Sequence, residues 1–371
     1  GISKRIHASQ PSPDTFFCED GSLNLAVISP QHFEAFLLYK INEGKLKVST
    51  LSGYRSAIKD VYRQKRLDLP SEYLDDLKTL YQGFKRVKAE DDQSGRSRRP
   101  GKQPLSYSLY AQLAKITLAL EDNGFSHLFL LTQWNMMCRS VMVETLHLTH
   151  LHCADDSVGC VLHKTKTNQE GSGPKDPRHI YANPLQPSCC YMLALGLYLA
   201  SNPTLVHGKI FPGFNQKSRY SKTISSLLQD MTGEKVYGTH SIRKGVATFA
   251  SSGSTSGPSK VSVCLRCGWS LGGVQDRYFR YESAGDQYLG RVVAGLPQNS
   301  SHLANYLHFD DPLDDFVRKC TRNMFPVMDG DAHIAPVLQL CLASIAAHAT
   351  FLREKAEVKA RCIYVLRILQ L

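Results

Sequence analysis

Residues 89–104 divide the chain, because no apolar period runs through them. They contain Glu-Asp-Asp and then Ser-Gly-Arg-Ser-Arg-Arg-Pro-Gly-Lys, which offers nothing to bury in a core. A chain of 371 residues also exceeds the usual size of one domain. The sequence therefore predicts two domains joined by a basic linker at 89–104.

The part before this linker has the pattern of a small helical module. Residues 1–22 contain Pro, Ser and Asp without a period, and we expect a flexible lead-in there. In residues 23–88, apolar positions recur at helical spacing after Ser29-Pro30, from near Ser49, and after Pro70. We expect three helices, the second of which places Arg55 and Lys59 on its exposed side.

The part after the linker alternates between helical and strand patterns. Helices are expected at 106–120, 127–137, 187–200, 221–231, 241–250, 260–267 and 271–281, and strands at 146–151, 159–162 and 178–182. The predicted fold class is therefore mainly α (α+β), with a small antiparallel sheet set into a helical domain at 105–290.

Residues 291–371 form a predicted C-terminal helical extension, with helices at 334–352 and 357–371. The first of these is apolar but carries Gln339, Ser344 and His348, which favours a buried or partner-facing helix over a membrane span. We expect no membrane partner.

The charge balance is an excess of cations in a chain of modest charge content. The formal net charge is +11, although only 21% of the residues are charged. Nucleic acid is the natural partner of such a surface, but a basic protein without a polyanionic ligand has the same composition. Composition alone does not decide between these alternatives.

The cysteine and histidine clusters are weak candidates for metal sites. The chain has 11 cysteines, an odd number, and the sequence begins without an apolar leader, which favours a reducing compartment. Cys264-x-x-Cys267 lacks a second ligand pair at zinc-site spacing, and His147-x-x-His150-x-His152-Cys153 falls in a predicted strand. We expect core or surface residues at both places, with no metal and no cofactor.

The strongest chemical signal is a set of residues in the second half of the chain. Thr239-His240-Ser241-Ile242-Arg243 precedes Gly268-Trp269-Ser270, and Tyr278 stands nine positions beyond the tryptophan. A phenol is a poor nucleophile, so a tyrosine that attacks phosphate needs cations and hydrogen-bond donors around the transition state. His240, Arg243 and Trp269 could supply them, which predicts a phosphodiester-cutting site.

With Arg139 and Lys166 upstream, this order and spacing resembles the tyrosine recombinases. The segment Gly-Trp-Ser-Leu-Gly-Gly-Val-Gln-Asp-Arg-Tyr is most similar to the transposases of Crypton elements, and the resemblance covers roughly residues 20 to 290. It implies a core-binding domain at 23–88 and a catalytic domain at 105–290 that form a clamp on double-stranded DNA. It also implies a homo-oligomer on recombination sites, a nuclear location, and strand cleavage and rejoining without metal or ATP.

The resemblance gives each residue a role. Arg139 and Arg243 would bind the non-bridging phosphate oxygens, His240 would contact the phosphate or take the phenolic proton, and Trp269 would donate a hydrogen bond at a position where most members have histidine. Tyr278 would be the nucleophile, although Tyr281 lies one helical turn further on. Lys166 would protonate the leaving 5′ oxygen, and Lys164 remains an alternative.

One position departs from the family pattern. Many members carry an acidic residue three positions after the first arginine, where this chain has Met142, with Glu144 two positions later. The partner that would orient Arg139 is therefore not identified from the sequence.

Further cations are expected to contact DNA phosphates. They are Arg55, Lys59, Arg96, Arg98, Arg99, Lys102, Lys164 and Lys244. For those in the linker, a solvated tether is an equal alternative.

Two other functions fit much of the same pattern. A type IB topoisomerase shares the chemistry, and a catalytically inactive regulator derived from a recombinase would keep only DNA binding. For the extension at 291–371 we expect either packing on the catalytic domain or docking on a neighbouring subunit, and the family comparison favours some exchange between subunits.

Overall fold

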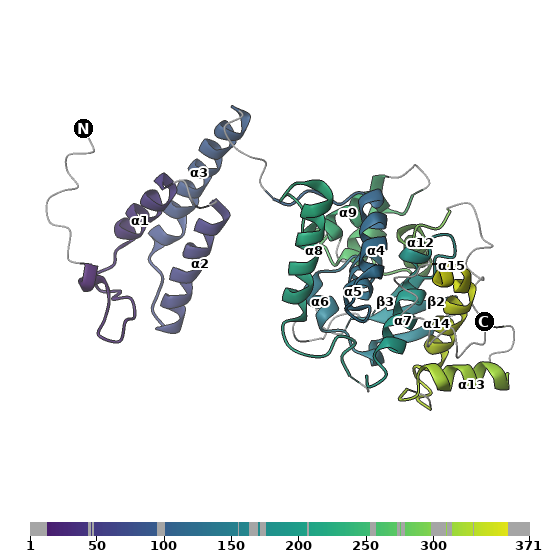
Figure 1. Ribbon diagram of the computed structural model, residues 1–371. Helices are drawn as coiled ribbons and strands as arrows, with labels where there is room; N and C mark the ends of the chain where they lie inside the picture. Colours follow the sequence, from purple (N-terminus) through teal and green to yellow (C-terminus); the bar gives the residue numbers. More distant parts are fainter. Residues whose placement is uncertain are drawn as a thin grey trace. The chain divides into compact units, whose positions relative to one another are not determined.

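The computed structural model describes residues 13–43, 46, 48–94, 101–154, 156–162, 170, 176–205, 208–252, 257–272, 275, 279–297, 309, 314–328 and 330–354. The chain divides into two compact units, residues 1–100 and 101–371 (Figure 1). The division falls within the segment 89–104 that the sequence marks as a linker.

The first unit is helical and has its own core. Its helices are α1 (Pro30–Asn42), α2 (Val48–Gln64) and α3 (Asp75–Gln93), with a short 3-10 helix over Ser71–Tyr73. Ser29 caps α1, since its hydroxyl accepts the amide proton of His32, and Pro30 occupies the first turn. The core consists of Phe33, Leu37, Leu51, Ile58, Tyr62, Tyr73, Leu77, Tyr81 and Phe84.

Two predictions for this unit give wrong segment boundaries. The lead-in is ordered over Pro13–Phe16, which is a 3-10 helix, and Phe17 bridges to Leu23; residues 1–12 lie outside the described part. Helix α3 continues to Gln93, into the segment predicted to be a linker. The reason is local, because four of the six residues at 88–93, namely Lys, Ala, Glu and Gln, are good helix formers even without an apolar face.

The second unit is a helical domain that holds one small sheet. The strands β1 (Leu151–Ala154), β2 (Ser157–Val161) and β3 (Pro177–Tyr181) pair antiparallel in the order β1-β2-β3. The register places Val158 opposite both Cys153 and Ile180. The predicted class, mainly α with a small antiparallel sheet, is confirmed.

The helices of the second unit account for most of its described residues. They are α4 (Tyr107–Ala119), α5 (Phe125–Asn135), α6 (Ser140–Glu144), α7 (Tyr191–Ser201), α8 (Gln216–Thr232), α9 (Thr239–Ser252), α10 (Lys260–Cys267), α12 (Ser283–Val293), α13 (Asp315–Met324), α14 (Ala335–Ala347) and α15 (Ala349–Glu354). Short 3-10 helices span Leu148–His150 and Pro187–Cys189.

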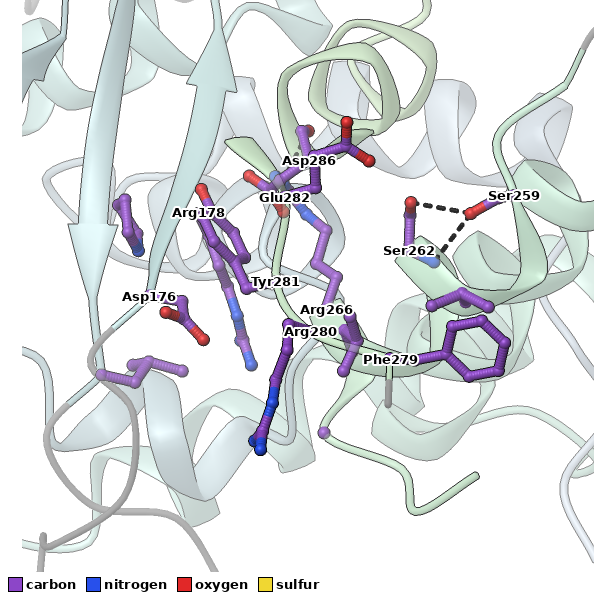
Figure 2. A pocket seen from close by; sticks show the side chains of 15 residues that line it. Asp176, Arg178, Ser259, Ser262, Arg266, Phe279, Arg280, Tyr281, Glu282 and Asp286 are labelled. Atoms are coloured by element: carbon purple, nitrogen blue, oxygen red, sulfur yellow. Dashed lines mark hydrogen bonds and ion pairs between the residues drawn. The ribbon is translucent and has the colours of Figure 1, made fainter. Parts of the chain in front are cut away.

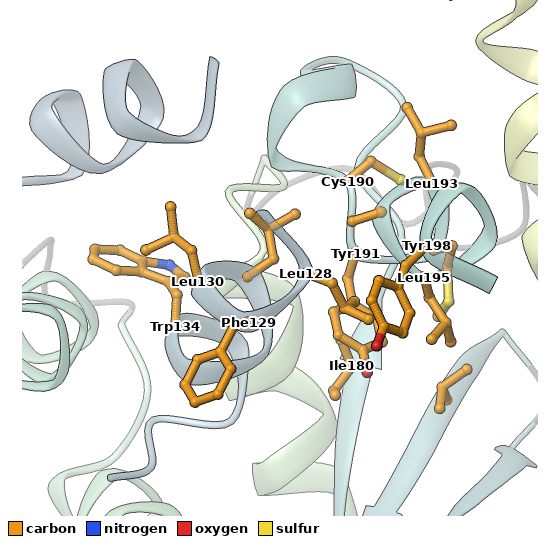
Figure 3. Close-up of a cluster of buried hydrophobic side chains, with 14 of the residues drawn as sticks. Leu128, Phe129, Leu130, Trp134, Ile180, Cys190, Tyr191, Leu193, Leu195 and Tyr198 are labelled. Carbon is orange, nitrogen blue, oxygen red and sulfur yellow. The ribbon is translucent and has the colours of Figure 1, made fainter. Parts of the chain in front are cut away.

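Helix α5 is the centre of the core. All of its residues are buried, and it packs against α4, α7, α8 and α9. Figure 3 shows Leu128, Phe129, Leu130 and Trp134 of α5 together with apolar side chains of α7 and Ile180 of β3. The indole of Trp134 stacks on Tyr110 and donates a hydrogen bond to the carbonyl of Val293. A helix held on every side is a rigid base for the residues that follow it.

Several predicted boundaries differ from the structure. The strand expected at 146–151 is a 3-10 turn followed by β1, because the buried Leu146, Leu148 and Leu151 change their spacing from two to three residues. Helix α8 begins at Gln216 rather than 221. In the helix expected at 271–281, Leu271, Gly272 and residues 279–281 are not helical.

The described part of the C-terminal extension packs on its own domain. Helix α14 lies against α7, where Gly196 meets Ile345 and the thiol of Cys190 lies 3.3 Å from the hydroxyl of Ser344. The extension is thus part of the core of the second unit, and the helix expected at 357–371 lies outside the described residues. No helix in the described ranges has the length and apolar character needed to cross a membrane.

Candidate active site

Arg139 is held at the junction between two helices. The chain leaves α5 through Met137, which has a left-handed backbone with φ 51°, and the amide of Cys138 donates to the carbonyl of Gln133. Arg139 is the N-cap residue of α6, and its carbonyl accepts the amide proton of Met142 at 2.8 Å. Its backbone is therefore fixed while its side chain remains partly exposed.

The first turn of α9 is anchored to the same base. The side-chain amide of Gln133 donates to the carbonyl of Thr239 at 2.9 Å, and the amide of Leu105 donates to the carbonyl of Ser241 at 2.9 Å. Gly245 allows this close approach, because a Cβ there would lie 2.0 Å from the carbonyl oxygen of Leu105. These contacts orient the turn that carries His240 and Arg243.

Arg243 is a buried cation with an unfilled hydrogen-bonding position. It is 7% exposed, its guanidinium donates to the carbonyl of Cys267, and its Cζ lies 5.5 Å from the ring centroid of Trp269. Its Nε is buried without a hydrogen-bond partner in the described part of the chain. Burial lowers the pKa of Arg243, and the charge of Arg139 lowers it further.

Arg139 therefore lies close enough to Arg243 for its charge to act on that guanidinium. Within the described ranges, neither forms an ion pair with a carboxylate. Two neighbouring guanidinium groups without a counter-ion repel each other, so an anion bound between them would remove an unfavourable interaction. This is the chemistry of a site for a phosphate.

Trp269 is not a core residue. It follows Gly268, which ends α10, and its side chain is 42% exposed beside Arg243. Packing in the interior therefore does not account for this tryptophan. On the side of Lys244 and Lys260, Trp269 borders a cavity of about 400 Å³.

His240, on the first turn of α9, is exposed.

Arg178 of β3 is a further cation that the sequence did not single out. It is 9% exposed, and its Nη1 donates to the carbonyl of Met136 at 3.0 Å. Burial raises the pKa of Cys138 to about 11, and the charges of Arg178 and Arg243 oppose this rise, as they also do for Cys267. Arg178 and Arg243 thus lie around the same two thiols. In the sequence, only a charged residue two positions before Ile180 in a predicted strand points to this buried cation.

Arg266 is a different case, because its charge is neutralised. Its Nη1 lies 2.7 Å from Oδ1 of Asp286, with both side chains buried. It also donates to the carbonyls of Asn135 and His179, while Oδ2 of Asp286 accepts the amide proton of His179. This network ties α10 and α12 to α5 and β3, and we assign it a structural role.

Arg178 and Arg266 both line a cavity of about 420 Å³ (Figure 2). Arg280 and Tyr281 enter it from the segment that precedes α12, and Asp176 immediately precedes β3. Burial raises the pKa of Tyr281 to about 12, which disfavours the phenolate and makes this residue a poor nucleophile. Tyr278, Lys164 and Lys166 lie outside the described residues.

The cations predicted to contact DNA have different surroundings. Arg55 donates to the carbonyl of Leu74 and is half-buried, so it supports helix packing in the first unit, and Lys59 beside it is also only partly exposed. Lys102 and Lys244 are exposed; Nζ of Lys102 donates to the carbonyl of Lys235, and Nζ of Lys244 donates to that of Lys102. Lys102 therefore belongs to the second unit rather than to a free linker. Arg96, Arg98 and Arg99 lie outside the described residues.

Glu144 does not orient Arg139. Its Oε1 accepts the amide proton of Lys217 at 3.0 Å, which joins α6 to the first turn of α8, and Met142 is buried. In the part of the chain that the structure describes, no three His, Cys, Asp or Glu side chains are grouped to hold a metal ion.

Comparison of the sequence with models of protein families and with curated proteins finds no match.

Proposed function

We propose that this protein cleaves and rejoins DNA in the manner of a tyrosine recombinase. The observation that carries the proposal is the pairing of Arg139 with the buried Arg243, without a carboxylate on either in the described residues and with an unused Nε on Arg243. Anions with several acceptor oxygens satisfy such a pair, and a backbone phosphate is the anion that a basic protein meets on DNA.

In the proposed reaction, Arg139 and Arg243 bind the two non-bridging oxygens of the scissile phosphate. The phenolic oxygen of Tyr278 forms a bond to phosphorus as the bond to the 5′ oxygen breaks, which leaves a 3′-phosphotyrosyl link. Lys166 gives its proton to the departing 5′ oxygen, and His240 takes the phenolic proton. Attack by a 5′ hydroxyl reverses these steps, so rejoining needs no ATP.

Trp269 has a supporting role in this scheme. Its ring lies beside the Arg243 guanidinium, with Cζ 5.5 Å from the ring centroid, and would hold water away from that side of the cation, which strengthens the interaction with phosphate. Its indole N–H can donate to a phosphate oxygen but cannot carry a proton between groups.

The larger assembly follows from the same proposal. The helical first unit and the catalytic second unit would close round double-stranded DNA as a clamp, with Arg96, Arg98, Arg99 and Lys102 near the backbone. A homo-oligomer would exchange strands between paired sites of a mobile element in the nucleus.

The test is covalent capture on DNA. Duplexes selected for binding from a random pool would be nicked near the bound site, so that the cleaved strand diffuses away and the adduct accumulates. We expect a protein–DNA adduct that resists boiling in detergent, its loss in Tyr278→Phe, and its retention in the matched variant Tyr281→Phe. An adduct that survives in Tyr278→Phe overturns the assignment of the nucleophile.

A DNA-binding regulator without cleavage is the second candidate, and one observation favours it. Glu144 accepts the amide proton of Lys217 and Met142 is buried, so among the described residues Arg139 has no ion pair with the acidic partner that many recombinases use. Sequence-specific binding without any adduct would support this candidate.

A further inference from the structure

Phe214 is exposed to an extent that no packing role explains. It is 96% exposed, whereas Phe211, three residues earlier, is fully buried. Phe211 contacts Phe125, Phe129 and Tyr198, with ring centroids 4.9 to 5.7 Å apart. One aromatic residue therefore anchors the loop while the next one points into solvent.

The backbone holds Phe214 in this position. Gly213 and Asn215 on either side both have left-handed conformations, with φ 99° and 57°. The carbonyl of Asn215 accepts the amide protons of Ser218 and Arg219, which starts α8. Left-handed backbone conformations are uncommon and are adopted where a turn requires them. The loop therefore has a defined conformation that holds the ring of Phe214 in solvent.

The surroundings of Phe214 are cationic. The first two turns of α8 carry Lys217, Arg219 and Lys222, all exposed, and the first turn holds no acidic residue. The carboxylate of Glu144, which reaches α8, accepts the amide proton of Lys217. An aromatic ring among cations suits a ligand that has both π-faces and phosphates.

This loop is also tied to the candidate active site. Glu144, the last residue of α6, contacts Lys217, while Arg139 caps the first residue of the same helix. A helix of five residues is only about 7 Å long, so Arg139 and the loop that carries Phe214 are joined through one short helix and one hydrogen bond. DNA bound at Arg139 that continues along this side of the second unit would meet Phe214.

We propose that Phe214 is an aromatic wedge that stacks on a base of the bound DNA, beside the phosphate that Arg139 and Arg243 hold. This rests on the proposed function in one respect, namely that the ligand is DNA. Lys217 and Lys222 bind the flanking phosphates, and the ring enters a base step that opens easily. The cations around the ring favour DNA over an apolar protein pocket.

The test measures binding of a fluorescent duplex that carries 2-aminopurine, a base whose emission rises when it is unstacked. Phe214→Ala is expected to weaken binding roughly tenfold and to abolish the emission change, whereas Phe214→Trp retains both. Phe316→Ala is the matched control, because Phe316 is another exposed aromatic residue, on α13. It should bind as the wild type does.

The salt dependence separates the ring from the charges. Phe214→Ala should keep the slope of log affinity against log salt, since it removes no charge, while Lys217→Ala should reduce it. Equal affinity and emission for Phe214→Ala and wild type overturn the wedge, as does an effect of Phe214→Ala on self-association alone. If the wild type binds DNA but forms no adduct, the cleavage proposal fails while the wedge is still measured; if the wild type binds no DNA, both fail.

Discussion

The guanidinium of Arg243 lies over the ring of Trp269, 5.5 Å from Cζ to the ring centroid, at the boundary between the protein interior and solvent. The tryptophan is 42% exposed and the arginine only 7%. The ring therefore shields a cation that has no carboxylate partner in the described ranges. Stability alone does not explain a buried, unneutralised charge, and this makes Arg243 a candidate for a functional residue.

Replacing this cation should separate stability from activity. Arg243→Met removes the desolvation cost of the charge and of its unpaired Nε, so we expect an unfolding free energy that is unchanged or higher by up to about 2 kcal/mol. The yield of DNA adduct should fall by at least roughly 100-fold. Urea unfolding followed by tryptophan fluorescence measures the first effect, because both tryptophans, Trp134 and Trp269, belong to the second unit. A strongly destabilised Arg243→Met would show that the residue is structural.

The same substitution at Arg266 should have the opposite effect on stability. Arg266→Met leaves the carboxylate of Asp286 buried without its cation, and the carbonyls of Asn135 and His179 lose a donor. We expect the unfolding free energy to fall by about 3–5 kcal/mol. The two arginine variants control for each other in the same fluorescence assay, and equal stabilities would refute the division into a functional and a structural arginine.

The contrast between these arginines explains what the sequence could and could not predict. Local signals are sufficient where a cap or a short period sets the structure, as at Ser29-Pro30, at β3 and at the helix start that carries His240. Arg266 bonds to atoms 131 and 87 residues away, so nothing near it in the chain says that its charge is neutralised. Arg178 is equally inconspicuous in the sequence, but it forms no ion pair with a carboxylate of the described residues. Which arginine is free to bind an anion depends on tertiary contacts alone.

The boundary errors have a similar origin. Leu146 and Leu148 alternate as in a strand, but a 3-10 turn over Leu148–His150 then shifts the spacing so that Leu151, the first residue of β1, is buried as well. Residues after Ala89 lack an apolar face, yet α3 extends through them on helix propensity. The two errors are opposite. The strand at 146–151 was predicted from an apolar period that does not continue, whereas the end of α3 was missed because it has no apolar period.

The close approach of α9 to Leu105, in the segment before α4, gives a steric prediction. Gly245→Ala places a methyl group 2.0 Å from the carbonyl oxygen of Leu105, and this backbone atom cannot move without shifting the turn that carries Arg243. We expect a loss of about 1–3 kcal/mol in stability and weaker DNA binding. Gly53→Ala is the control, because nothing lies within 4 Å of the new methyl group in α2. There we expect a gain of roughly 0.5–1 kcal/mol by thermal unfolding followed by circular dichroism.

Acidification should destabilise the second unit through His127. The ring is buried, its Nδ1 lies 3.1 Å from the hydroxyl of Thr117, and burial lowers its pKa to about 3. The unfolded chain therefore binds the proton first, so the unfolding free energy falls as pH decreases from about 6.5 toward 3, by up to about 1.4 kcal/mol per pH unit. His127→Asn should remove this part of the slope in urea titrations at pH 4 to 7. The same slope in both proteins would contradict the assignment.

The packing of the C-terminal extension determines whether the second unit folds without a neighbouring subunit. Ile345 of α14 is fully buried against Gly196 of α7, so Ile345→Ala leaves a cavity inside the chain's own core. We expect a loss of about 2–5 kcal/mol. Because the contact lies within one chain, the loss should not change with protein concentration, whereas a helix that docked on a neighbouring subunit would give a midpoint that rises with concentration. Phe316→Ala, which removes an exposed side chain from α13, should leave the midpoint unchanged at every concentration. A concentration-dependent midpoint in the wild type that disappears in Ile345→Ala would restore exchange between subunits as the role of α14.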